Sequence, residues 1–425
     1  MGEEGGSVTL LCLTASSGVP LFCRSLGAPS KHQLPFPVIG SLNGVHMFGA
    51  NLDVLLTAAC TTNTHVVWRV FHNSITLIVL SSEEGASDFA LGRLLDNAFS
   101  AMVLILGLEE LVNVRNIERL KKDLRACYKL IDSFLAPLER SGDLTQCVEC
   151  VPVPHGAALQ ECLEAFAGAA ESRFGCLVAG GRLALATEPW WQLAPQELLL
   201  LSWLVGSLPP HAARDYPIYL PHGSPTVPHR LLTCQLLPGL EACLICGPSP
   251  ALHTVETELV PRFWKPLLEP LQACVSPQPH SLPHGTTLPP GVLAFLLIHR
   301  EQRSSQSSVQ PPGSGGEGMS CPPTQPVGEG LSPRCRARAL RHFYALVAAR
   351  YFPWEGSPAP PQEPFQAGFP HRARHCYVVS ATHKAYAIHA PQHQLFLLLA
   401  PHVPTFALRP LAARTLQRLT GDTAL

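Results

Sequence analysis

Hydrophobic and polar positions along this chain alternate between the period of a strand and the period of a helix, and the order of the changes recurs. The apolar runs 7–14 and 19–25 flank a short turn and predict a β-hairpin. Apolar side chains at helical spacing follow over 34–48 and predict a helix. The rest of this first unit is predicted as strands 53–59, 65–71 and 74–81 and helices 86–112 and 114–138. The predicted order is therefore ββαβββαα.

A similar order returns in a second unit, and a third unit resembles the first two but carries a long insertion. The second unit begins with a predicted helix at 156–171, and its later elements are strands 175–179 and 182–186, helix 195–206, strands 216–220, 229–236 and 241–245, and helix 252–274. The third unit is predicted as strand 292–299, a basic helix at 334–351, strands 376–380, 385–389 and 395–400, and a last helix at 405–419. A repeated order of elements indicates duplicated architecture. We therefore predict an α/β (α+β) chain of three similar domains.

Composition shifts mark the expected domain boundaries. We place the first domain at 1–140, the second at 141–275 and the third at 291–425, with a proline-rich linker at 276–290. Residues 302–330 are rich in Gly, Pro, Ser and Gln, so they cannot bury enough apolar area to fold. We expect this stretch to be a disordered insertion in the third domain.

Overall composition narrows the class of function. Hydrophobic residues make up 46% of the 425 positions and charged residues 14%, so most of the chain should fold. The formal net charge of -1 argues against nucleic acid as a partner, because no basic excess is present to hold phosphates. The N-terminus lacks an apolar signal core, and many of the 15 cysteines lie in apolar strand-like runs. We expect a cytoplasmic protein with reduced thiols and no membrane span.

Motifs for covalent chemistry are missing from the sequence. It contains no Walker-type phosphate loop and no GxSxG nucleophile elbow, so we predict a protein that is not an enzyme and needs no cofactor. Two CxxC spacings occur, at Cys147 and Cys150 and at Cys243 and Cys246. Zinc needs four ligands, usually from two such pairs on loops, and the second pair lies in a predicted strand. A thiol- or metal-dependent enzyme is the alternative from another class.

Three other features suit either the core or a partner. The paired Trp190 and Trp191 could plug a gap between sheet and helix or anchor an interface. The helix at 38–48 could cover one sheet face or pair with another protein, since its glycines allow close backbone approach. The basic run from Arg334 to Arg341 could be a solvated helix face or make a weak contact with acidic lipid headgroups.

Several sequence strings are similar to those of a known family. They are PFPVIGSLNGVHMFGANL (35–52), FHNSITLIVLSS (71–82), NIERLKKDL (116–124), LIDSFL (130–135), GDLTQCV (142–148) and WLVGSLPPHAARDYPIYLPHGSPTVPHRLLT (203–233). They resemble the longin-domain subunits of the ciliogenesis and planar polarity effector complex. This resemblance implies three tandem longin domains, each a five-stranded, mainly antiparallel sheet packed with helices.

The resemblance also implies the partners and the role. It implies pairing with the longin protein Inturned, a WD-repeat subunit in the same complex, and binding of a Rab-like small GTPase. The implied role is in ciliogenesis, intraflagellar transport and Hedgehog signalling at the base of the cilium, with guanine nucleotide exchange as an activity of the heterodimer. A peripheral membrane-trafficking tether is the alternative. The residues predicted to bind partners are Val38, Ile39, Leu42, Val45, Phe48, Trp190 and Trp191.

Overall fold

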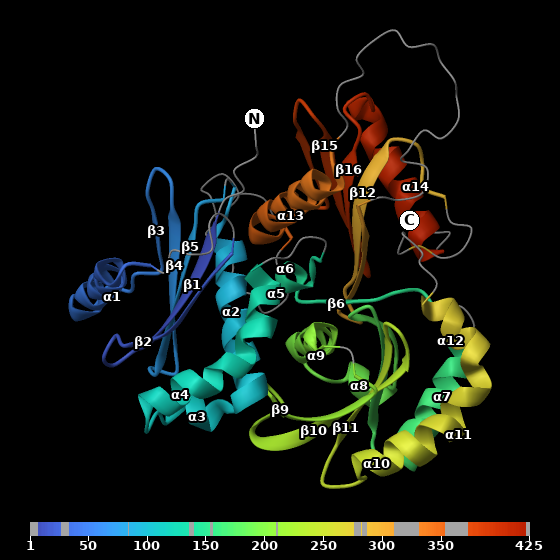
Figure 1. The fold of residues 1–425 in the computed structure, drawn as a ribbon. Helices are drawn as coiled ribbons and strands as arrows, with labels where there is room; N and C mark the ends of the chain where they lie inside the picture. Colours follow the sequence, from blue (N-terminus) through green and yellow to red (C-terminus); the bar gives the residue numbers. More distant parts are fainter. Residues whose placement is uncertain are drawn as a thin grey trace. The chain divides into compact units, whose positions relative to one another are not determined.

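The computed structural model describes residues 7–26, 34–83, 85–135, 140–153, 156–209, 211–275, 282, 287–309, 331–352 and 373–421. The chain forms two compact units. The large unit contains Met1–Pro137 and Val153–Val275, and the small unit contains Leu138–Pro152 and Ser276–Leu425. Each unit is described by itself below, with elements labelled as in Figure 1.

The first sheet of the large unit has strand order β2-β1-β5-β4-β3, with every neighbour antiparallel. Its strands are β1 (Val8–Thr14), β2 (Pro20–Leu26), β3 (Ala58–Cys60), β4 (His65–Phe71) and β5 (Ile75–Ser81). Its helices are α1 (Phe36–Asn51), α2 (Asp88–Leu106), α3 (Leu108–Val112), α4 (Ile117–Asp123) and α5 (Tyr128–Leu135), with a 3-10 turn at Leu124–Cys127. Helices cover both faces of this sheet, α1 on one side and α2 on the other (Figure 1). Central strands such as β1 are therefore apolar on both faces.

The second sheet repeats this topology, with order β8-β7-β11-β10-β9. Its strands are β7 (Phe174–Ala179), β8 (Arg182–Ala186), β9 (Ala213–Leu220), β10 (Ser224–Leu237) and β11 (Leu240–Cys246). Its helices are α7 (Gly156–Ala169), α8 (Glu188–Trp191), α9 (Pro195–Ser207), α10 (Leu252–Thr254), α11 (Val260–Trp264) and α12 (Leu268–Val275), with a π turn at Val255–Leu259 and a 3-10 turn at Lys265–Leu267. The helices α7, α11 and α12 share a core with one face of the sheet, and α9 lies on the other face (Figure 1).

The two folds of the large unit share a core. Helix α2 packs against β9 and α9, and α5 packs against α9. The rings of Phe134 on α5 and Trp203 on α9 stack with centroids 4.7 Å apart. The Gln196 side chain donates to the Asn97 side chain over 3.2 Å. Because these contacts join elements of different sheets, we infer that the first and second folds stabilise each other.

The small unit contains the third sheet, with order β14-β15-β16-β12-β13-β6. Its elements are α6 (Gly142–Thr145), β6 (Val148–Glu149), β12 (Val292–His299), β13 (Ser304–Ser308), α13 (Pro333–Arg350), β14 (His375–Val379), β15 (Lys384–His389), β16 (His393–Leu399), a 3-10 turn at Thr405–Ala407 and α14 (Leu408–Thr420). Phe343 and Tyr344 of α13 pack against Phe396 on one face of this sheet. Leu408 and Leu416 of α14 lie in the core on the other face. Without β6, the strand order matches that of the first two sheets.

One described helix has the length and composition of a membrane span. This helix is α2, and 61% of its most apolar window is buried inside the protein. Its buried side chains pack against the first sheet, α5, α9 and β9. Core packing in the large unit accounts for its apolar character.

Four predicted elements need correction. The predicted strand 53–59 is a strand only at β3, and the residues before it form an exposed loop. The predicted helix 86–112 is interrupted at Gly107, whose φ of 83° ends α2. The predicted helix 114–138 is two shorter helices joined by a 3-10 turn. Within the predicted insertion 302–330, Ser304–Ser308 forms β13, while residues 310–330 lie outside the described part of the chain.

Three short elements were not predicted, and they are α6, β6 and α8. Two of them change the assignment of a segment. Residues 141–152 were placed in the second domain, yet β6 pairs with β13 in parallel and belongs to the third sheet. The predicted linker 276–290 lies largely outside the described residues.

Partly buried histidines should make the small unit sensitive to acid. Burial lowers the pKa of His299, and the neighbouring His393 lowers it further. Burial also lowers the pKa of His383. The folded state therefore binds these protons less readily than the unfolded state, whose histidines titrate near ~6.5. The free energy of unfolding should therefore be highest above the unfolded pKa of ~6.5. It should decrease as the pH falls from this value toward the lower pKa of the folded state.

We expect the protection of β12 and β16 amides against hydrogen exchange to fall between pH 7.5 and about 5.5. The fall should be smaller in the variant His299→Gln, which removes the titrating ring next to His393. Equal pH dependence in the two proteins would contradict this assignment to His299.

Candidate protein-binding surface

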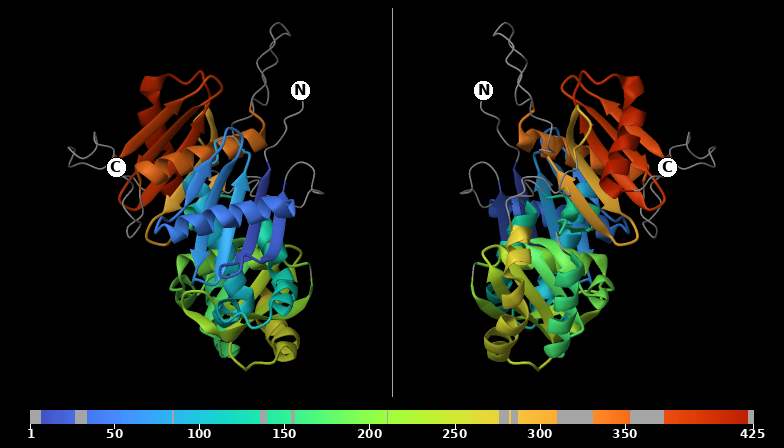
Figure 2. Two further views of the ribbon diagram at one scale, coloured as in Figure 1. Left: turned by 90° about the vertical axis from the view of Figure 1, so that its left-hand side faces the viewer. Right: turned by 90° about the vertical axis from the view of Figure 1, so that its right-hand side faces the viewer.

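Helix α1 has an inner face that attaches it to the first sheet. Ile39 is buried, and Leu42 is partly buried in the same core. The indole nitrogen Nε1 of Trp68 donates to the Leu42 carbonyl over 3.3 Å. These contacts place α1 across the strands of the sheet (Figure 2). The helix is therefore held by a few contacts along one side.

The outer face of α1 is apolar and exposed. Val45 is 57% exposed, Phe48 66% and Leu52 60%, and Val38 precedes them on the same face. The spacing from Val38 to Val45 to Phe48 to Leu52 is seven, three and four residues, which places these side chains in one stripe along a helix. This spacing is typical of helices that pack against another helix.

The loop after α1 enlarges the apolar surface. The Val54 amide donates to the Gly49 carbonyl over 2.9 Å, which folds the loop back on the end of the helix. Val54 and Leu55 are 58% and 74% exposed. We call the exposed apolar side chains of this region the α1 patch, which consists of Phe36, Val38, Val45, Met47, Phe48, Leu52, Val54 and Leu55.

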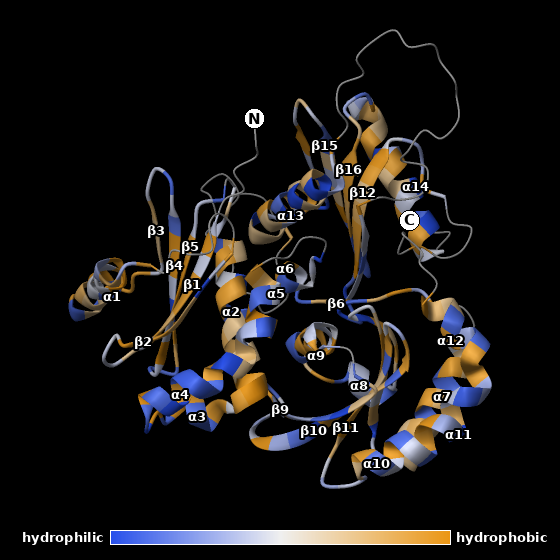
Figure 3. Cartoon of the chain, viewed as in Figure 1, coloured by the Kyte–Doolittle hydropathy of each residue, from blue (hydrophilic) through white to orange (hydrophobic). Residues whose placement is uncertain are grey.

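Helix α1 contains no Asp, Glu, Lys or Arg. Figure 3 colours much of this helix as hydrophobic, with bluer stretches between. A surface helix of a globular protein usually carries charged residues on its outer face. A side chain added at Gly40 or Gly44 would meet no atom within 4 Å, so another backbone could approach closely there. Burying one Val, Leu or Phe side chain contributes about 1.5–3 kcal/mol. The α1 patch is therefore a surface that gains free energy when another protein covers it.

The structure divides the predicted partner-binding residues. Val38, Val45 and Phe48 lie on the outer face of α1, whereas Ile39 and Leu42 face the sheet. Periodicity did not separate these two groups because α1 is apolar all round. The prediction missed five members of the patch. Phe36 and Met47 lie within α1 itself, and the apolar run before β3 was the signal for Leu52, Val54 and Leu55.

The tryptophan pair lies in the second fold, on the short helix α8 that follows β8. Trp190 is 2% exposed and packs in the core, so it has no surface to offer a partner. Trp191 is partly buried. The structure therefore gives Trp190 the packing role, and a partner contact through Trp191 stays a prediction.

Comparisons with known proteins establish the family. Models for the "First Longin domain of FUZ, MON1 and HPS1", the "Second Longin domain" and the "Third Longin domain" match residues 8–134, 170–265 and 291–423 in that order. "Protein fuzzy homolog" of Xenopus tropicalis is 55% identical over 423 residues, which is 99% of each chain. The proteins of the same name from Mus musculus and Homo sapiens are 56% and 55% identical, again over 99% of each chain. The chain belongs to the Fuzzy family.

Family membership confirms the prediction of three tandem longin domains. Each family match covers one of the three sheets, and each sheet has the same strand order once β6 is set aside. The segment 138–152 lies between the first and second matches and belongs to the small unit. The α1 patch lies in the first of these longin domains.

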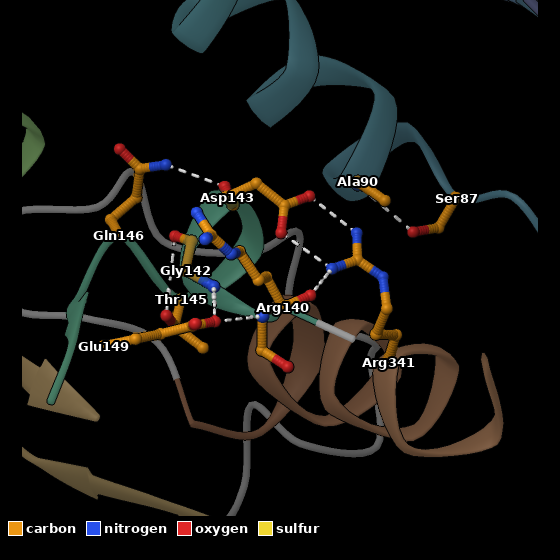
Figure 4. Close-up of polar contacts among 10 residues, drawn as sticks. Ser87, Ala90, Arg140, Gly142, Asp143, Thr145, Gln146, Glu149 and Arg341 are labelled. Carbon is orange, nitrogen blue, oxygen red and sulfur yellow. Dashed lines mark hydrogen bonds and ion pairs between the residues drawn. The ribbon is translucent and has the colours of Figure 1, made fainter. Parts of the chain in front are cut away.

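The small unit contains a cluster of charged and polar side chains that bond to one another (Figure 4). Arg341 of α13 donates to both carboxylate oxygens of Asp143, over 2.7 and 2.6 Å, and also to the Arg140 carbonyl. The Glu149 carboxylate accepts from the Ser141 and Gly142 amides over 2.6 and 3.2 Å. The charged groups of Arg341, Asp143 and Glu149 thus each have hydrogen-bond partners within the cluster. The cluster therefore holds the segment 140–149 against α13 and presents no reactive group.

Several buried thiols of this Fuzzy-family chain are poorly suited to act as nucleophiles or metal ligands. Burial raises the pKa of Cys150 to about 12, and the pKa of Cys234 to about 12. Burial also raises the pKa of Cys12 well above its usual range. A thiol is a nucleophile or ligand only as the thiolate, which burial disfavours. Among the residues that the structure describes, no three His, Cys, Asp or Glu side chains gather as a metal site.

The basic run on α13 is only partly a solvated face. Arg336 is partly buried and donates to the carbonyls of Leu331, Leu293 and Val309, and burial lowers its pKa. Arg341 is engaged by Asp143. The exposed arginines of α13 are Arg334, Arg338 and Arg350, and a contact with acidic lipid headgroups would use these side chains.

Proposed function

We propose that this chain is a non-enzymatic subunit of a planar cell polarity effector complex. In this proposal it pairs with an Inturned-like longin protein, assembles with a WD-repeat subunit and binds a Rab-like small GTPase. The complex acts at the cytoskeleton of the ciliary base in ciliogenesis, intraflagellar transport and Hedgehog signalling. The observation that carries the pairing is the α1 patch, an uncharged apolar stripe on the first longin domain of a Fuzzy-family chain.

Guanine nucleotide exchange by the heterodimer needs no acid, base or nucleophile from this chain. A surface that binds the nucleotide-free GTPase more tightly than the nucleotide-bound state shifts the equilibrium toward release. The buried thiols and the matched polar cluster of the small unit are consistent with a role of this kind. Exchange therefore belongs to the proposal as a property of the pair rather than of one subunit.

Charged substitutions on the outer face of α1 should abolish pairing. In the variant Val45→Glu with Phe48→Glu, two exposed apolar side chains become carboxylates that the partner would have to desolvate. Anchor residues of interfaces cost about 2 kcal/mol or more each, so we expect binding to weaken by at least about 100-fold. The measurement is the dissociation constant of the purified full chain for an Inturned-like partner, with circular dichroism to check the fold.

Val227→Glu is the matched control, because Val227 is 56% exposed on β10 of the second fold. This control should bind the partner like the unaltered chain. Full-strength binding by the folded α1 variant would refute the placement of the interface. Release of a fluorescent GDP analogue from the GTPase, measured with the heterodimer and with each subunit alone, tests exchange separately.

A further inference from the structure

The three longin sheets have equivalent edge strands, but these strands differ in length, proline content and packing. The edge strands β3, β9 and β14 occupy the same place in the strand order. β3 is only three residues long. β9 contains Pro217, which cannot donate to an added strand, and α2 packs against it. β14 has neither of these protections: it spans His375–Val379, contains no proline, and pairs with β15 alone among the described residues.

The register of β14 shows which backbone groups point away from the sheet. The His389 amide donates to the Arg374 carbonyl over 2.8 Å, and the Ser380 amide donates to the His383 carbonyl over 2.9 Å. Bonded pairs alternate along an antiparallel ladder. The even-numbered residues of β14 therefore face β15. The amides and carbonyls of His375, Tyr377 and Val379 point to the open edge.

The side chains of this edge are apolar and exposed. Tyr377 is 59% exposed, Val379 is 52% and Val378 is 41%. Tyr377 lies opposite Tyr386 in the register and stacks with its ring, so it extends the sheet face that α14 covers. Exposed edges are often protected by a bulge or a proline in the strand, and β14 contains neither.

The surroundings of β14 are basic. Arg409 and Arg374 contribute to lowering the pKa of His375, after burial, so both cationic groups act at this edge. Lys384 lies opposite Val379 in the register. No Asp or Glu occurs between residues 373 and 421. An incoming strand with carboxylates would be attracted, and a second copy of β14 would bring like charges together.

We propose that β14 binds an extended segment of a partner protein as an added strand, in which acidic residues alternate with valine-like or aromatic residues. The partner's backbone pairs with the outward amides and carbonyls of Tyr377 and Val379. Its apolar side chains cover Tyr377 and Val379 on the face that carries α14. Its carboxylates lie on the opposite face and pair with the exposed Arg374. When a strand is added to an open edge, main-chain hydrogen bonds provide the affinity and side-chain contacts provide the specificity. This surface is separate from the α1 patch and does not depend on the proposed pairing.

The test uses the full chain and labelled nine-residue peptides in fluorescence anisotropy. One peptide alternates Val or Tyr with Asp or Glu, and a second replaces each acid with Lys. The variant Val379→Pro removes one outward amide and leaves the even-numbered bonds to β15 in place. Val379→Thr is its control, because it keeps both the amide and the β-branched shape. Arg374→Glu tests the charge, and thermal unfolding of each variant checks the fold.

We expect saturable binding of the acidic peptide and none of the basic one. Val379→Pro should weaken the binding about tenfold, as loss of a main-chain pairing position predicts, and Val379→Thr by less than about twofold. Arg374→Glu should weaken the binding of the acidic peptide and strengthen the binding of the basic one. Equal binding to the unaltered chain and to a folded Val379→Pro variant would mean general charge attraction and would overturn the proposal. A concentration-dependent dimer of the full chain that Val379→Pro dissolves would also overturn it, since the occupant would then be a second copy.

Discussion

Replacing Arg341 with alanine should destabilise the small unit by about 3–5 kcal/mol, because the substitution leaves the Asp143 carboxylate without its cation. The Asp143 and Arg341 side chains are 9% and 15% exposed, so solvent can replace little of what is lost. The Arg140 carbonyl also loses a donor. The segment that carries α6 and β6 should then leave the third sheet first, since β6 pairs with β13 over only two residues.

The expected result is a loss of hydrogen-exchange protection at β6 and β13 before any loss at β12 and β16. The control is the double variant Asp143→Leu with Arg341→Met, which removes both charges and keeps apolar volume. Replacement of a whole buried pair is often neutral, so this variant should be much closer to the unaltered chain than Arg341→Ala. If the single and double variants lost the same stability, the ion pair would not be what holds the segment.

The Arg341 cluster shows why the domain boundary could not be read from the sequence. Asp143 and Arg341 are 198 residues apart, and each is an ordinary charged residue in its own neighbourhood. The predicted boundary at 141 followed the end of the predicted helix 114–138, which is a local signal. Membership of β6 in the third sheet depends on a pairing that closes a long loop, and no periodicity records such a contact.

The periodicity of apolar residues was sufficient to predict an element where its apolar side chains are buried at regular positions. The predicted strands 65–71 and 292–299 coincide with β4 and β12, which alternate or run apolar against covered faces. It failed where the pattern was ambiguous. The run from Leu52 to Leu56 looked like a strand, yet its side chains up to Leu55 are exposed in a loop. An apolar run can therefore indicate a binding surface as well as a core.

The candidate site was located by the sequence, but its orientation was not. Apolar spacing predicted the helix of α1, and its glycines suggested contact with another protein. Which face meets the sheet depends on Trp68, whose side chain bonds the Leu42 carbonyl from a strand far along the chain. The net charge of -1 for the whole chain also gave no sign of the basic character of the third domain. Its described residues 331–352 and 373–421 contain no Asp or Glu.

The second large effect is expected at the contact between the first and second longin domains. Trp203 is 2% exposed on α9 and stacks with Phe134 of α5. Truncating a buried tryptophan to alanine costs about 3–5 kcal/mol. Because its ring belongs to a core that both folds share, Trp203→Ala should reduce the hydrogen-exchange protection of β1 and β5 as well as that of β7 and β11.

Trp264→Ala provides the matched control for this prediction. Trp264 is also 2% exposed, but it packs against Phe166 on the opposite face of the second sheet, in the core with α7 and α12. Under native conditions its truncation should lower protection in the second fold and leave β1 and β5 unchanged. If Trp203→Ala also left β1 and β5 protected, the two longin domains would be independent, and the shared core would not couple them. Coupling would mean that a partner bound at α1 is held by a scaffold whose stability depends on the second domain, because α2 and α5 pack on both the first sheet and α9.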